Sequence, residues 1–106
     1  MDNDDILIEL DALIITLDSL IEIMFESTKE VIDLGNINYY LKDIILKLDK
    51  LIDGIEDSNK KNMLETAKNN ITYAKLDIIE DEDIFNKINK LKEAKNILID
   101  IKLQKI

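Results

Sequence analysis

The sequence predicts an all-α fold: an antiparallel up-down bundle of four helices, or of three, with a long N-terminal helix. Apolar residues recur at alternating spacings of four and three over most of the chain, which is the helical period. The 106 residues include no proline and only 2 glycines, so few positions force a helix to end. Aromatic residues make up 5% and turn residues are scarce, which argues against a β-domain. This length suits a single helical-bundle domain over residues 1–106.

The first expected helix covers residues 4–34, which is roughly 45 Å at about 1.5 Å per residue. Four apolar residues widen its main stripe, namely Ile8, Ile15, Phe25 and Ile32. The helix is therefore expected to be the central one of the bundle, or to self-associate through these four residues, for instance as a homodimer. The main stripe consists of Ile6, Leu10, Leu13, Leu17, Leu20, Met24, Val31 and Leu34.

Gly35 followed by Asn36 predicts the first break, because glycine suits the end of a helix and asparagine caps the start of the next one. The second helix is then expected over residues 37–55. A single helix kinked at Gly35 is the alternative, because the first stripe continues in phase through this position. We favour the turn, since glycine is unfavourable inside a helix. The second stripe consists of Ile37, Leu41, Ile44, Leu48, Leu51 and Ile55.

Two more helices are expected, over residues 59–80 and 83–105. Asp57 and Ser58 can cap the third helix, and its Ala67 and Ala74 would permit a neighbouring helix to approach closely. The third stripe loses its phase at residues 81–83, where acidic residues can begin a fourth helix. The two stripes consist of Leu64, Ala67, Ile71, Ala74 and Ile78, and of Ile84, Ile88, Leu91, Leu98 and Ile101. The residues expected at the centre of the core are Leu13, Leu17, Leu20, Leu41, Leu48, Ile71, Leu91 and Leu98.

Negative charge is concentrated in the first expected helix. Residues 1–34 contain ten acidic residues and one lysine, a balance of −9 that equals the net charge of the whole chain. Four of these acids follow one another at spacings of four, and each such like-charge pair is unfavourable by roughly 0.2–0.5 kcal/mol. Either lysines of the last helix (Lys87, Lys90, Lys92 and Lys95) neutralise this ladder inside the bundle, or a basic partner protein binds it. The candidate partner-binding residues are the ladder and its flanks: Asp11, Asp18, Glu22, Glu26, Glu30 and Asp33.

The composition excludes most catalytic chemistry. The chain has no cysteine and no histidine, so disulfides, zinc sites built on these residues and histidine acid–base catalysis are ruled out. No calcium-binding loop occurs, and two isolated glycines cannot form a phosphate-binding loop. We therefore expect no enzymatic activity, no cofactor and no metal. All 14 basic residues are lysine in an acidic chain, which is unsuited to direct nucleic-acid binding.

No membrane association is expected either. The most apolar stretch, residues 6–25, contains Glu9, Asp11, Asp18 and Glu22, which are too many acids for a membrane span. The acidic N-terminus lacks the basic residues of a secretory signal, so a cytoplasmic location is expected. The 21 isoleucines, 10 asparagines and exclusive use of lysine are typical of an AT-rich genome.

These observations predict a non-enzymatic acidic interaction protein that binds another protein, which it inhibits or stabilises. By analogy of size and charge alone, immunity proteins, antitoxin-like inhibitors and phage anti-defence proteins are the classes in question. The alternative is a structural or assembly subunit that self-associates through the N-terminal helix. The oligomeric state separates the two, because an inhibitor is expected to be a monomer or small dimer and an assembly subunit a larger species.

Overall fold

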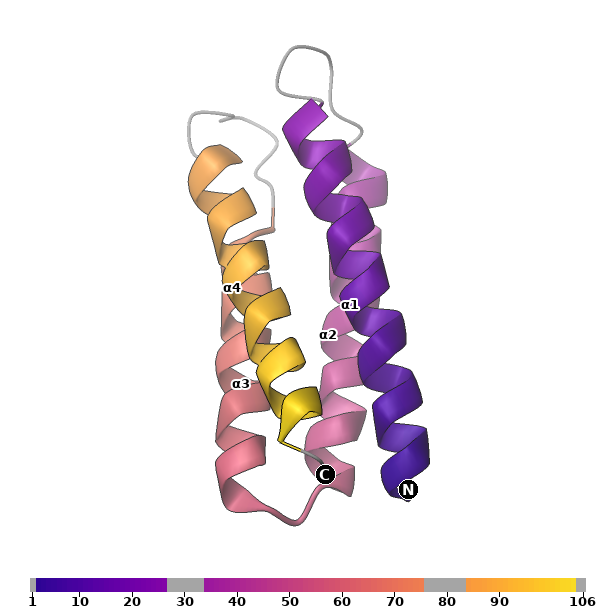
Figure 1. The fold of residues 1–106 in the computed structure, drawn as a ribbon. Coiled ribbons are helices and arrows are strands. Elements are labelled where there is room, and N and C mark those ends of the chain that lie inside the picture. Colours follow the sequence, from indigo (N-terminus) through magenta and orange to yellow (C-terminus); the bar gives the residue numbers. More distant parts are fainter. Residues whose placement is uncertain (1, 27–33, 76–83, 105–106) are drawn as a thin grey trace.

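The computed structural model describes residues 2–26, 34–75 and 84–104, and within these ranges the chain forms four helices and no strand. The helices run up, down, up and down, so that consecutive helices are antiparallel (Figure 1). The bundle measures 42 × 19 × 18 Å along its principal axes. The predicted all-α bundle of four helices, with the N-terminal helix the longest, is confirmed. The helices are α1 (Asn3–Glu26), α2 (Leu34–Gly54), α3 (Ser58–Tyr73) and α4 (Ile84–Leu103).

The helices form a ring in which α4 returns to the side of α1 (Figure 1). Backbone contact is most extensive between α3 and α4, followed by α1 and α4, whereas α1 approaches α2 much less closely. Ala67, Ala74 and Ala94 are all fully buried, and small side chains of this kind permit two helix axes to come as close as α3 and α4 do. This agrees with the close approach predicted from the alanines of the third stripe.

The four apolar stripes meet inside the bundle and form one continuous core. Burial of these aliphatic side chains is the main favourable contribution to the stability of such a fold. None of the eight residues predicted at the centre of the core is more than 3% exposed. They are Leu13, Leu17, Leu20, Leu41, Leu48, Ile71, Leu91 and Leu98.

Gly35 and Asn36 belong to the second helix and do not separate it from the first. α1 ends at Glu26 and α2 begins at Leu34, so both residues lie in the first turn of α2. The predicted first helix cannot include Leu34, and the predicted residues 27–33 lie outside the described residues. A single helix kinked at Gly35 is excluded because α1 and α2 are separate antiparallel helices (Figure 1). Asparagine suits a helix start because the first four N–H groups of a helix have no intrahelical acceptor and its side-chain oxygen can accept from them.

The helix α3 is shorter than predicted, since it ends at Tyr73 and not at residue 80. The N–H of Ala74 donates to the carbonyl oxygens of Asn70 and Ile71, both at 3.1 Å. The bond to Asn70 has the ordinary α-helical reach of four residues, whereas the bond to Ile71 spans three residues and tightens the last turn. The bounds of α4 agree with the prediction to within two residues. The expected core residue Ile78 lies outside the described residues.

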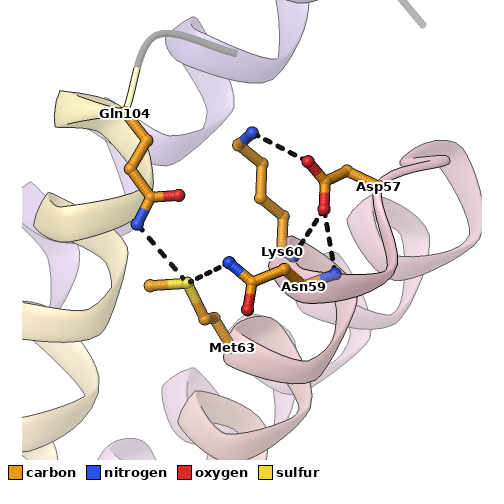
Figure 2. A network of polar contacts seen from close by, with 5 residues as sticks. All are labelled: Asp57, Asn59, Lys60, Met63 and Gln104. Carbon is orange, nitrogen blue, oxygen red and sulfur yellow. Dashed lines mark hydrogen bonds and ion pairs between the residues drawn. The ribbon is translucent and has the colours of Figure 1, made fainter.

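The turn between α2 and α3 is fixed by Asp57, one of the two predicted N-caps of α3, whereas the other, Ser58, is the first residue of the helix. Its carboxylate accepts hydrogen bonds from the backbone N–H groups of Asn59 at 2.9 Å and Lys60 at 3.2 Å, and it pairs with Lys60 Nζ at 3.1 Å (Figure 2). One turn further, Met63 Sδ accepts from Asn59 Nδ2 at 4.0 Å and from Gln104 Nε2 at 3.7 Å (Figure 2). Because Gln104 follows α4, these contacts join the start of α3 to the end of α4.

Replacing Asp57 by Ala should lower the melting temperature, because the first N–H groups of α3 lose their acceptor. The hydrogen bond from the Lys60 ammonium lowers the pKa of Asp57 below its ordinary 3.8, and backbone N–H groups act in the same direction. The stabilisation is therefore complete above a pH of about 3.8 and is lost as the pH falls through the lower folded value. Asp57→Asn keeps a capping oxygen that does not titrate, so its melting temperature should approach that of the wild type in acid. Thermal melts followed by circular dichroism across this pH range test the prediction. If the melting temperatures of the wild type and of Asp57→Asn change in parallel with pH, the prediction is contradicted.

Candidate protein-binding face

The acidic residues of α1 fall into two groups, according to whether α4 neutralises them. Asp11 Oδ1 lies 2.5 Å from Lys102 Nζ, and Asp18 Oδ1 lies 2.7 Å from Lys95 Nζ. Both lysines belong to α4, which runs antiparallel beside α1 (Figure 1). The explanation by internal pairing thus holds for these two aspartates.

The two ion pairs belong to one antiparallel register. Asp11 and Asp18 are seven residues apart, and so are Lys95 and Lys102, so the same contact repeats about two helical turns further along. Lys95 is one of the lysines expected to face the acidic ladder, whereas Lys102 is not predicted from the sequence. The signal that could have found it is the equal spacing of two acids on one helix and two lysines on another.

Glu22 and Glu26 are the next members of the ladder, and both are exposed. Neither forms an ion pair with any residue that the structure describes. They are four residues apart on one face of α1, so their carboxylates repel each other. We call this pair the open acidic end of α1. The remaining predicted partner-binding residues, Glu30 and Asp33, lie outside the described residues.

A groove of about 470 Å³ lies between α1 and α4 next to the open acidic end. It is lined by Ile21 and Phe25 on its apolar side and by Asp18, Glu22 and Lys92 on its polar side. Phe25, which the sequence predicts as a self-association residue, is 58% exposed. An exposed aromatic ring beside unpaired carboxylates is an arrangement that can hold a partner protein by apolar contact and select it by charge.

Of the four lysines expected to neutralise the ladder, only Lys95 pairs with a carboxylate of α1 in the described ranges. Lys90 lies over the ring of Tyr73 on α3, 5.8 Å from its centre. Lys87 is only 9% exposed, and Lys92 lines the groove without forming an ion pair to a described residue. Neutralisation of α1 by α4 is therefore partial, and it stops before the open acidic end.

Two other predicted self-association residues lie on the outward face of α1. Ile8 is 67% exposed and Ile15 is 66% exposed, whereas Leu10, Leu13 and Leu17 on the inward face are at most 2% exposed. The described helices therefore do not bury the full width of the apolar arc of α1. The fourth predicted residue of this set, Ile32, lies outside the described residues.

The fold is an all-α four-helix bundle, and the outward face of its helix α1 is acidic. Among the residues that the structure describes, no three acidic side chains gather into a group that could hold a metal ion. None of the four described helices is long and apolar enough to cross a membrane. A comparison with protein-family models, curated proteins and solved structures finds no match to this chain. The function has to be inferred from the chemistry of α1.

Proposed function

We propose that this chain is a non-enzymatic binding protein that attaches through α1 to a basic surface of another protein, which it inhibits or stabilises. The observation that supports this function best is the state of Glu22 and Glu26. No residue that the structure describes pairs with them, and they lie beside the exposed Phe25 in a fold whose lysines neutralise Asp11 and Asp18. Immunity proteins, antitoxin-like inhibitors and phage anti-defence proteins are the classes that this proposal covers.

The physical reason is that an unrelieved pair of like charges on one helix face is unfavourable by roughly 0.2–0.5 kcal/mol. A basic partner would remove this repulsion on binding. The same carboxylates would attract the partner before contact and so raise the association rate. The exposed ring of Phe25 would then supply the apolar contact that holds the complex together.

A structural or assembly subunit is the second candidate, and the exposure of Ile8 and Ile15 favours it. Self-association would bury both side chains. It would also bring together the carboxylates of two copies of α1, which carries no lysine. We prefer the basic partner for this reason. Size-exclusion chromatography with light scattering separates the two functions, because an assembly subunit should run as a species larger than a dimer.

The experiment that tests the proposed function uses three immobilised baits against a lysate of the source organism. They are the wild type, Glu22→Gln/Glu26→Gln, and the control Glu56→Gln/Asp100→Asn. The control removes two exposed carboxylates from other parts of the bundle, so both variants have the same net charge. We expect a basic protein to be enriched by the wild type and the control, and to be reduced several-fold on the Glu22→Gln/Glu26→Gln bait.

The association rate with the captured protein gives the quantitative result. It should fall for Glu22→Gln/Glu26→Gln, and its dependence on salt should flatten, since fewer charges steer the encounter. The thermal stability of this variant should stay level or rise slightly, because the repulsion between the two side chains is gone. Equal enrichment by all three baits, or a stability loss with unchanged binding, would contradict the proposal and assign a structural role to the ladder.

A further inference from the structure

The outward face of α1 carries a second regular stripe besides the one that enters the core. Its members follow one another at spacings of four and three, so they lie in line along the helix. All of them are exposed, and the two isoleucines are the most exposed large apolar residues of α1. The outer stripe, as we call it, consists of Ile8, Ala12, Ile15, Ser19, Glu22 and Glu26.

The spacing of the outer stripe indicates what shape of partner fits it. The large Ile8 and Ile15 alternate with the small Ala12 and Ser19, so the face offers ridges and hollows at the heptad spacing. A second helix laid along α1 packs its own side chains into such hollows. The neighbours of α1 in the bundle, α4 and α2, leave this face open, as the exposure of both isoleucines shows.

The charges around the outer stripe indicate which helix can cover it. α1 contains seven carboxylates and no lysine over its 24 residues. Asp4, Asp11 and Asp18 border the stripe on one side, and Glu22 and Glu26 continue it beyond Ser19. A second copy of this chain would bring an equally acidic helix to the stripe in either direction, and like charges facing each other disfavour that contact.

We infer that the outer stripe of α1 binds a basic amphipathic helix of the partner protein. Apolar residues of that helix cover Ile8 and Ile15, and its lysines or arginines lie beside Asp4 and against the open acidic end, since Asp11 and Asp18 are already paired with lysines of α4. This inference rests on the proposed function, and it specifies the partner's binding element as a helix with one apolar face flanked by positive charge. The outer stripe thus has an apolar half, with Ile8 and Ile15, that would hold the partner helix by apolar contact. Its acidic half, with Glu22 and Glu26, would orient that helix by charge.

Two synthetic peptides of about 21 residues, or three heptads, test this inference. One places leucine at the seam positions of a helix and lysine beside them, and the other has the same composition with the leucines distributed around the helix. Isothermal titration calorimetry should show that the wild type binds the first peptide about tenfold more tightly than the second, a difference of about 1.4 kcal/mol. The preference should disappear in Ile8→Ser/Ile15→Ser.

The matched control is Leu46→Ser/Leu103→Ser, which removes two aliphatic side chains that are 53% and 72% exposed on α2 and α4. This variant should keep the full preference for the amphipathic peptide. Circular dichroism of both variants establishes that the fold is intact, and since all four side chains are exposed the melting temperatures should differ little from the wild type.

Any one of the following results would overturn the inference. Equal affinity for the two peptides, or no binding of either, would show that the stripe does not select an amphipathic helix. A preference that survives in Ile8→Ser/Ile15→Ser would place the binding elsewhere. A wild-type dimer that this variant dissociates, measured by light scattering, would identify a second copy as the occupant. If a captured basic protein depends on Glu22 and Glu26 but not on Ile8 and Ile15, the proposed function stands and the inference alone fails.

Discussion

Replacing Leu17 by Ala is expected to lower the free energy of unfolding by about 2–5 kcal/mol, and so is replacing Leu48 by Ala. Both side chains are 0% exposed, and they lie in the middle of α1 and α2. Truncation removes buried methyl groups and leaves a cavity that the neighbouring side chains fill only in part. A domain of this size is stable by about 5–15 kcal/mol, so one such change removes a large fraction of its stability.

Denaturation by urea or guanidinium measures this loss, with Leu46→Ala as the control. Leu46 belongs to the same helix as Leu48 but is 53% exposed, so its truncation should change the stability by less than about 0.5 kcal/mol. A loss below about 1 kcal/mol for Leu17→Ala or Leu48→Ala would show that the residue does not belong to the packed core.

The core is the part of this fold that the sequence predicts best, because the spacing of apolar residues along one helix determines which side faces inward. That decision does not depend on how the neighbouring helix is placed. The stripe from Ile37 to Ile55 is therefore buried as predicted, although its helix begins at Leu34, before the predicted start at Ile37. Helix ends are harder to predict because a cap-forming pair such as Gly35 and Asn36 is also tolerated in the first turn of a helix.

The candidate site is less predictable from the sequence than the core. The position of the acids on α1 is a property of one helix, and the sequence predicts it. Which of these acids are neutralised depends on the register between α1 and α4, which no spacing along a single helix determines. The structure pairs Asp11 and Asp18 with lysines of α4 and leaves Glu22 and Glu26 unpaired among the described residues. The register thus decides which part of the ladder remains available to a partner.

This register is held from the other side of α4. α4 packs closely on α3, and the fully buried small side chains Ala67, Ala74 and Ala94 permit such an approach, so the position of α4 relative to α1 is limited by how near α3 and α4 can come. The alanines of the core therefore influence the charge pattern on the far surface of the bundle. A substitution that separates α3 from α4 should disturb the alignment of Lys95 with Asp18, although it touches neither residue.

Replacing Ala67 by Leu is accordingly expected to lower the free energy of unfolding by about 1–3 kcal/mol, because extra methyl groups in a filled core force side chains and backbone apart. Ala67 is 0% exposed, so the larger side chain cannot turn into the solvent without moving the helix. Chemical denaturation measures the loss. The control is Thr66→Leu, the exposed neighbour on α3, which should leave the stability unchanged or raise it slightly because leucine favours the helix.

The effect on the charge pattern is tested by a double-mutant cycle between Asp18→Asn and Lys95→Gln, measured with and without Ala67→Leu. In the wild-type background the coupling between the two side chains should be at most about 1 kcal/mol, since Asp18 is largely exposed. We expect it to fall toward zero when Ala67→Leu displaces α4. The prediction is contradicted if Ala67→Leu is as stable as the wild type and the coupling is unchanged. The core between α3 and α4 would then have room for the larger side chain, and other contacts would set the register of α1 and α4.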